Sequence, residues 1–221
     1  MKIKRKHQFL FALLGLLHVC FAQKNIELSD TVNHRYLSIQ IDTCTHDGAC
    51  SGKGIVRLKN INGKVVQSFT IGNMFFSKNN DLDKETLGPV TFRDFNFDGY
   101  NDLAIVNGNS GNYSFTSYAI YLFSPEQHRF LLNKELTALS NESMGLFEND
   151  KKRKRIITHA KGGFTASVDQ EFVFETPYHI QNVLIRLINI HENIVEEKTN
   201  TFNNGKWITT NRSYMIKENK K

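Results

Sequence analysis

The sequence predicts an all-β protein: an antiparallel β-sandwich or distorted β-barrel of about eight or more strands with few short helices. Short segments that alternate apolar with polar residues recur along most of the chain. Asn-Gly pairs at 62–63 and 204–205 are typical of two-residue hairpin turns. Helical periodicity is confined to two short segments, so sheets must form the core.

The expected strands follow one another from Arg35 onward. In chain order they are Tyr36–Ile41, Ile55–Leu58, Val65–Ile71, Val90–Arg93, Leu103–Val106, Tyr118–Phe123, Phe130–Lys134, Ile156–Lys161, Val168–Phe174 and Val183–Ile190. A final pair of strands is expected on either side of Asn204-Gly205. Asn133–Ser140 and Glu192–Lys198 are the segments that could hold a helical turn or two.

The first residues, "MKIKRKHQFLFALLGLLHVCFAQ", are typical of a cleaved secretory signal peptide. A cationic start precedes an apolar run, Phe9–Phe21, that is too short to span a bilayer comfortably, and the small Ala22 follows it. We therefore expect a signal peptide at 1–22, a single β-rich domain at 23–221, and a periplasmic or secreted protein. A lipoprotein anchored at Cys20 is the less favoured alternative, because His18 and Val19 fit a lipobox poorly.

The charge of the remaining chain argues against a nucleic-acid partner. The formal net charge of the full sequence is +6, but four basic residues belong to the signal, which leaves about +2. The basic run in "NDKKRKRIITHAKGG" is better explained as a solvated turn over Asn149–Lys152 than as a nucleic-acid patch. No further apolar segment approaches membrane-spanning length, so no membrane span is expected.

Cys44 and Cys50 lie close together in "DTCTHDGACSG". In an exported protein such a pair favours a disulfide across a tight turn, with Gly48 supplying the bend. The alternative is a metal site that uses both thiols with His46 and Asp47, which requires reducing conditions.

The stretch "RDFNFDGYNDLAIV" has the spacing of a calcium loop. Oxygen donors fall at positions 1, 3, 5, 7 and 9, and they are Asp94, Asn96, Asp98, the Tyr100 carbonyl and Asp102. Gly99 at position 6 permits the sharp turn that points the donors inward. A flexible set of carboxylates and a carbonyl suits Ca²⁺ better than Mg²⁺, so the cofactor expected is calcium and the domain a calcium-binding one.

An EF-hand is excluded, because position 12 is Ile105, inside a strand, where an EF-hand places a glutamate. The pattern instead matches the shorter D-x-[DN]-x-D-G-x-x-D loops of FG-GAP and dockerin-like modules. The alternative is an aspartate-rich turn held by its own hydrogen bonds without metal.

A second polar loop, "NGNSGNYSFTSY", follows the next strand directly. Ser110 and Tyr113 offer hydroxyls on a turn that Gly111 makes flexible, and a tyrosine can both pack and donate a hydrogen bond. The alternative is a mobile hairpin connection with the tyrosine lying back on the sheet.

The chain resembles the calcium-binding branch of the bacterial periplasmic lysozyme inhibitor-like family, whose members act as immunity proteins against peptidoglycan-cleaving effectors. The resemblance rests on "DFNFDGYNDLAI", the Gly-Ser-Tyr loop, "YAIYLFSPEQHRF" and "NDKKRKRIITHAKGG", and covers roughly Thr91–Phe174. It implies that Ser110, Gly111 and Tyr113 form an inhibitory loop that enters a lysozyme cleft. The family motif is S-G-x-x-Y-like, whereas "SGNY" has one residue fewer.

The function expected is therefore inhibition of a lysozyme-like peptidoglycan hydrolase. A calcium-stabilised envelope module that binds a glycan or a protein is the alternative, and the sequence leaves a homodimer open. Enzymatic activity is not expected, because the chain has no nucleophile elbow, no H-E-x-x-H motif and no phosphate-binding glycine loop. Asp94 and Asp98 would make a poor glycosidase pair if they hold a cation.

Overall fold

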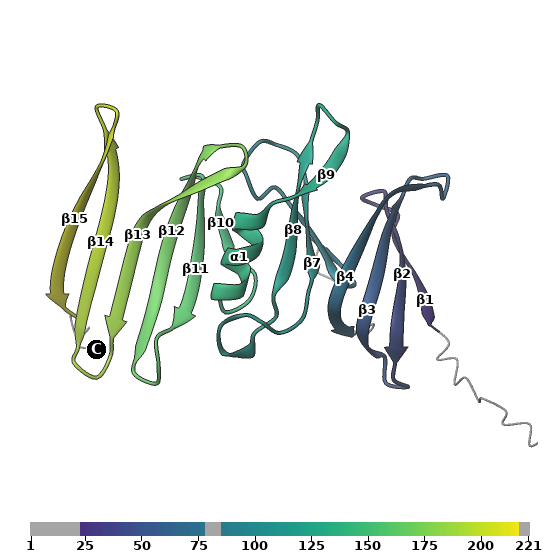
Figure 1. Cartoon of the computed structure of the whole chain (residues 1–221), viewed down its shortest axis with the longest axis horizontal. Helices are drawn as coiled ribbons and strands as arrows, with labels where there is room; N and C mark the ends of the chain where they lie inside the picture. Colours follow the sequence, from purple (N-terminus) through teal and green to yellow (C-terminus); the bar gives the residue numbers. More distant parts are fainter. Residues whose placement is uncertain (1–22, 78–84, 217–221) are drawn as a thin grey trace, which may run out of the picture.

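A computed structural model describes residues 23–77 and 85–216, and three antiparallel sheets follow one another along its long axis (Figure 1). The expected signal peptide lies outside the described residues. Within the described ranges, no helix combines the length and the apolar character needed to cross a membrane.

The first sheet has four strands in the order of the chain. They are β1 (Lys24–Asp30), β2 (Arg35–Cys44), β3 (Ala49–Lys59) and β4 (Val65–Ser77). Asn62-Gly63 lies in the connection from β3 to β4, as predicted, but this connection spans residues 60–64 and is longer than the two-residue turn expected; Gly63 has a positive φ of 76°.

The second sheet, at the centre of the molecule, has five strands. They are β5 (Thr86–Leu87), β6 (Val90–Arg93), β7 (Asp102–Val106), β8 (Tyr118–Ser124) and β9 (Arg129–Leu132). Helix α1 (Lys134–Glu142) follows, and it begins where the Asn133 side chain accepts a hydrogen bond from the Leu136 N–H at 2.9 Å.

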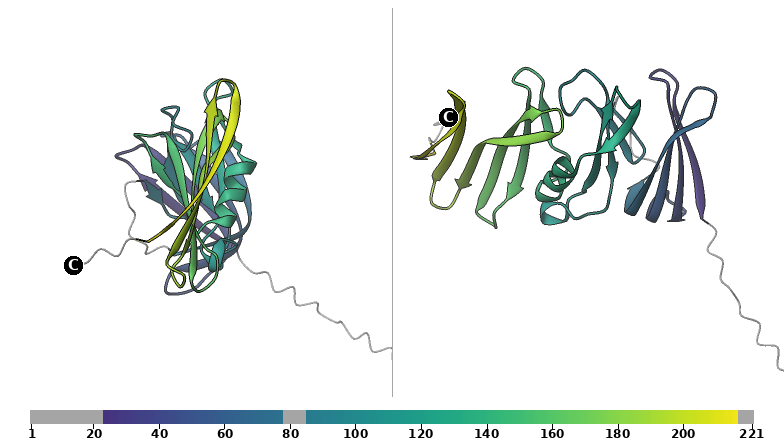
Figure 2. Two further views of the ribbon diagram at one scale, coloured as in Figure 1. Left: turned by 90° about the vertical axis from the view of Figure 1, so that its left-hand side faces the viewer. Right: turned by 45° about the horizontal axis from the view of Figure 1, so that its top comes forward.

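The third sheet has six strands. They are β10 (Glu148–Asp150), β11 (Arg155–Lys161), β12 (Ala166–Thr176), β13 (His179–Asn189), β14 (Ile194–Asn203) and β15 (Lys206–Met215). In the view along the long axis, the sheets overlap and α1 lies on one side (Figure 2).

Two hydrophobic cores lie on opposite faces of the central sheet. Leu103 and Ile105 of β7 pack with β1–β4, whereas Ala104 between them packs with α1, β11 and β12. Side chains alternate faces along a strand, so a strand buried at every position, as β7 is, must have both faces covered. The all-β sandwich prediction is confirmed.

Most predicted elements are present, and one is wrong. The helix expected at Asn133–Ser140 is α1, but the segment Glu192–Lys198 forms the end of a turn and, from Ile194, the start of β14. This segment lies between β13 and β15 and pairs with both, so tertiary pairing overrides the helix propensity of its Glu and Lys residues. Strand β1 was not predicted. The basic turn occupies 151–154, and Asn149-Asp150 belong to β10.

The disulfide prediction is confirmed. Cys44 and Cys50 are directly opposite each other in the β2–β3 register, with their Cα atoms 4.0 Å apart, and they are bonded. Gly48 in the intervening turn has φ of 93°. Cys50 is fully buried in the first core, so the bond fastens the hairpin end to that core.

Candidate metal loop and binding tip

The two predicted loops lie at opposite ends of β7. The acidic loop connects β6 to β7, and the polar loop connects β7 to β8. Successive hairpin connections of an antiparallel sheet lie at opposite ends of its strands. Asp102 and Val106, the first and last residues of β7, are about 14 Å apart along the strand. The two loops are therefore separated by the length of β7, and β7 connects them directly.

The acidic loop is closed by hydrogen bonds among its own groups. Asp94 Oδ1 accepts the Asp98 N–H at 3.1 Å, and Asp94 Oδ2 accepts the Gly99 N–H at 2.9 Å. Asp98 accepts the Tyr100 N–H at 2.8 Å and the Asn96 side-chain amide at 2.8 Å. Gly99 has the positive φ predicted for the bend, 92°.

Asp102 differs from the other loop carboxylates because it is fully buried. Its Oδ2 accepts the Phe95 N–H at 2.7 Å and its Oδ1 accepts the Phe123 N–H at 2.8 Å, which joins the loop to β8. Burial raises the pKa of Asp102 to about 7; the two N–H donors oppose this rise, and the charges of Asp98 and Asp94 add to it. No ion pair to Asp102 is formed by the described residues.

The donor set fits a hard divalent cation in its chemistry. Three carboxylates, an amide oxygen and a carbonyl are available, and Asp102 is a buried carboxylate without a counter-cation. Within 23–77 and 85–216, however, no three His, Cys, Asp or Glu side chains form a group that could hold a metal ion. An ion would have to compete with the Asn96–Asp98 hydrogen bond. Calcium binding therefore stays a prediction.

The acidic loop also contacts the third sheet. The Asn149 side-chain amide donates to the backbone oxygens of Asp94 at 3.0 Å and Phe95 at 3.3 Å. The rings of Phe97 and Phe174 meet edge to face at 6.4 Å. The loop is therefore fixed on both sides, between the central sheet and β10 and β12.

Hydrogen bonds between Asn107–Gly108 and Ser117 join the two ends of the polar loop. The Asn107 N–H donates to Ser117 O at 2.8 Å, and the Ser117 N–H donates to Gly108 O at 2.9 Å. The Ser117 hydroxyl adds a bond to Asn107 O at 2.9 Å, and Gly111 N–H reaches Phe115 O at 3.0 Å. These bonds extend the β7–β8 hairpin into the loop.

The tip of this loop is anchored to two other segments. The Asn112 N–H donates to Ser143 O at 2.9 Å. The Asn112 side chain donates to Lys161 O at 3.2 Å and accepts the Lys161 N–H at 2.9 Å. Gly111 is closely packed against neighbouring backbone: an added Cβ would come within 2.7 Å of Phe115 O and 2.9 Å of Ser143 O. A larger residue at this position would therefore displace the turn.

Tyr113 projects from this anchored turn. Its backbone is in the left-handed region with φ of 55°, and 52% of the residue is exposed. The Lys161 ammonium lies 5.5 Å from the ring centre, within cation–π range. Ser110 is also exposed, whereas Gly111 is buried. The structure thus brings the three predicted residues together, with two on the surface and the third supporting them.

Sequence reasoning missed the anchors of the tip. Asn112 and Lys161 are 49 positions apart, and their contact depends on the end of β11 reaching the β7–β8 connection. No local pattern carries that information.

Comparisons with known proteins give a fold neighbour. No protein-family model matches the chain, and no curated protein matches it. Among solved structures, the chain is similar to a Xanthomonas type IV secretion system related protein, with a TM-score of 0.65 and 17% identity. The match covers 87% of this chain and 94% of the other, and at this identity it shows a shared fold.

Proposed function

We propose that the chain is an exported inhibitor of a lysozyme-like peptidoglycan hydrolase, and that the turn carrying Ser110, Gly111 and Tyr113 enters the active-site cleft of that enzyme. The observation that carries the proposal is an exposed Tyr113 on a turn whose backbone is anchored to β11 and to the segment after α1. The chain itself performs no catalysis in this proposal.

The chemistry of the tip suits such a target. A glycosidase needs two carboxyl groups free on either side of its sugar substrate, and hydroxyl donors placed between them would occupy both. Ser110 and Tyr113 supply the donors. Because the turn is already held by hydrogen bonds, little conformational freedom is lost on binding, and this favours affinity.

Calcium in the acidic loop has a structural role in this proposal. Asp94, Asn96, Asp98, Asp102 and the Tyr100 carbonyl would hold it. A bound ion would supply positive charge beside the buried Asp102 carboxylate. Asp102 already ties β7 to β8, so its side chain connects the loop to the two strands that carry the tip.

Two findings support an envelope setting. The Cys44–Cys50 disulfide is of a kind that persists in oxidising compartments. The structural neighbour is a secretion system related protein, which fits a role among secreted factors.

A turbidity assay on suspended cell walls tests the proposal. Lysozymes from several structural classes are assayed with and without the chain, and at least one class should be slowed. Tyr113→Ala should raise the concentration needed for half inhibition about tenfold or more, as expected for a central aromatic contact. Tyr178→Ala, which removes an exposed tyrosine from the β12–β13 turn, should leave inhibition unchanged.

The alternative function has its own outcome in this assay. If no lysozyme class is slowed but the chain is retained on peptidoglycan, the chain is an envelope binding module and the inhibitor proposal is wrong.

A further inference from the structure

Strand β15 is a long edge strand, and no segment within residues 23–77 and 85–216 pairs with its outer side. It pairs with β14 over all ten of its residues, with no register shift, and it ends the third sheet (Figure 1). Every β15 residue except Trp207 is exposed. An edge of this kind offers unpaired backbone donors and acceptors to another strand.

Other sheet edges of the described chain are protected in recognisable ways. β5 has two residues and β10 has three, which is too short to template pairing. The edge strand β9 is capped by Gln67, whose side chain bonds the Phe130 N–H at 2.9 Å and the Phe130 carbonyl at 2.8 Å. β4 carries register shifts against β3, and β1 carries three charged side chains in seven residues.

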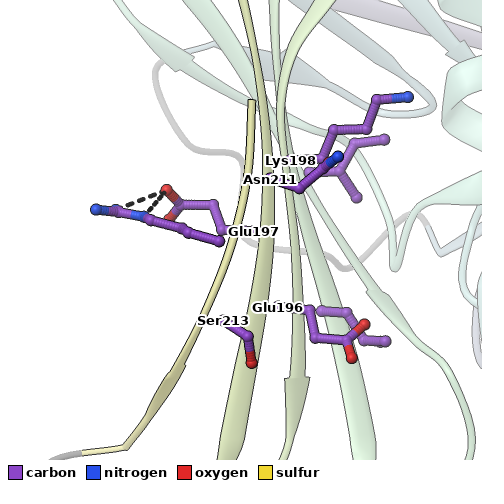
Figure 3. A pocket seen from close by; sticks show the side chains of 8 residues that line it. Glu196, Glu197, Lys198, Asn211 and Ser213 are labelled. Atoms are coloured by element: carbon purple, nitrogen blue, oxygen red, sulfur yellow. Dashed lines mark hydrogen bonds and ion pairs between the residues drawn. The ribbon is translucent and has the colours of Figure 1, made fainter. Parts of the chain in front are cut away.

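β15 has two charged side chains in ten residues, Lys206 and Arg212. Lys206 stands at its first position, and the four residues from Ile208 to Asn211 are uncharged. The Arg212 guanidinium donates to the buried Glu197 on β14 at 2.7 Å. Figure 3 shows Glu197 on one side of β14, with Glu196 and Lys198 on the other.

We propose that β15 pairs antiparallel with β15 of a second copy of the chain, around a two-fold axis at Asn211. In this register each exposed apolar side chain of the strand meets another. Ile208 is opposite Tyr214 of the second copy, and Trp207 is opposite Met215 of the second copy. Cross-strand pairs of aromatic and aliphatic side chains stabilise sheets, and sulfur–aromatic contacts add to them.

Charge selects this register over its neighbours. An axis at Arg212 would place Arg212 opposite itself, and an axis at Thr209 would place Lys206 opposite Arg212, so both set like charges against each other. An axis at Thr210 would set Ile208 opposite Arg212 and Tyr214 opposite Lys206. The axis at Asn211 instead sets Arg212 opposite the neutral Thr210.

The second copy is favoured over a foreign strand because the edge is complementary to itself. The inference is independent of the hydrolase proposal. The tip belongs to the central sheet, so pairing at β15 leaves Tyr113 exposed on both copies (Figure 1). The resulting pair would have one continuous twelve-stranded sheet, formed from two six-stranded ones.

Single cysteines test the register in the chain exported to a bacterial periplasm, with the Cys44–Cys50 bond intact. A residue on the two-fold axis lies opposite the same residue of the second copy. The two Cα atoms are then about 5 Å apart, a distance that suits a disulfide. Asn211→Cys should therefore cross-link to itself at least tenfold faster than Thr209→Cys or Ser213→Cys. The Thr209 positions lie about 14 Å apart along the paired strands, but a mixture of the Thr209→Cys and Ser213→Cys chains should cross-link.

Charge variants at Thr210 test the same contact without cysteines. Thr210→Lys faces Arg212 of the second copy and should shift the mass measured by light scattering toward one copy; Thr210→Glu should shift it toward two. A wild-type chain that keeps the mass of one copy at about 100 µM would overturn the proposal, as would equal cross-linking rates at 209 and 211. Self-linking that is fastest for Thr210→Cys would also overturn the register stated here.

Discussion

The side-chain amide of Asn112 bonds both backbone atoms of Lys161, accepting the Lys161 N–H at 2.9 Å and donating to the Lys161 carbonyl at 3.2 Å. Asn112 imitates a neighbouring β-strand at the end of β11. The turn that presents Tyr113 is thus held by the third sheet as well as by the central sheet that it extends from.

Asn112→Ala should release this turn. Two hydrogen bonds are lost from a partly solvated site, so the free energy of unfolding should fall by about 1 kcal/mol. The Lys161 amide should exchange with solvent faster, and half inhibition should need a higher concentration of the chain. Asn109→Ala, at an exposed asparagine in the same loop, is the control and should change none of these three quantities. Unaltered Lys161 protection in Asn112→Ala would show that the anchor is not needed.

Asp98→Ala should abolish a calcium-induced rise in the melting temperature. With free calcium at about one hundred times the dissociation constant, binding to the native state adds about 2.7 kcal/mol, which corresponds to a rise of about 5–10 °C. Differential scanning calorimetry with calcium and with a chelator measures the shift. Asn101→Ala changes an exposed loop residue that is not a predicted ligand, and it should retain the shift. A rise that persists in Asp98→Ala would contradict the loop assignment.

His179 should make stability depend on pH near neutrality. Its Nδ1 lies 2.6 Å from Glu135 Oε1, and this hydrogen bond, together with the charge of Glu135, raises the pKa of His179 above 6.5. Partial burial acts to raise the pKa of Glu135, but the Ile180 N–H and His179 outweigh it, so that pKa falls below 4.5. The contribution of His179 to the free energy of unfolding is fully present below pH 6.5, and it is lost as the pH rises through the raised pKa of His179. The contribution of Glu135 to the free energy of unfolding is lost as the pH falls through the lowered pKa of Glu135.

The Tm of His179→Ala should therefore be lower than that of wild type near pH 5.5, and the two Tm values should converge near pH 8.5. Because the pair is solvent-exposed, the difference should be small, on the order of 1 °C in Tm. His191→Ala, in the turn after β13, serves as the control and should follow wild type throughout. A difference between His179→Ala and wild type that is the same at pH 5.5 and 8.5 would reject the ion pair.

Glu197→Ala should be far more costly than Glu196→Ala, although the residues are adjacent. The Glu197 side chain is 4% exposed and is paired with Arg186 at 3.1 Å and with Arg212. Its removal leaves two guanidinium groups without their partner, which should lower the free energy of unfolding by about 2 kcal/mol. Glu196 is exposed on the opposite face of β14, so its loss should change stability by less than about 0.5 kcal/mol. Urea unfolding of both variants provides the comparison, and similar midpoints would contradict it.

The features that the sequence predicts well are those set by near neighbours. The two-residue turn at Asn204-Gly205, the Cys44–Cys50 bond and the alternation along β7 each depend on residues a few positions apart. The grouping of Ser110, Gly111 and Tyr113 on one turn is local in the same way, and so is the set of oxygen donors in the acidic loop.

What the sequence does not reveal depends on contacts between distant segments. Glu192–Lys198 has helix-forming residues, but β13 and β15 on either side hold it as a strand. Asn112 has no local sign of its bond to Lys161. Asp102 looks like one more acid in a series, and only the fold makes it a buried carboxyl group, bonded by the Phe95 and Phe123 N–H groups, with a raised pKa.

The burial of β7 on both faces has a consequence for how the molecule comes apart. Both cores include residues of this strand, so the melting of either core would remove the packing from one face of β7 and weaken the other core. Partial opening should instead begin in the β14–β15 hairpin, whose outer strand has no core beneath it. Tyr113 lies in the connection between β7 and β8, so the turn that presents it is joined to the strand that both cores hold, and local opening at β15 should leave that turn in place.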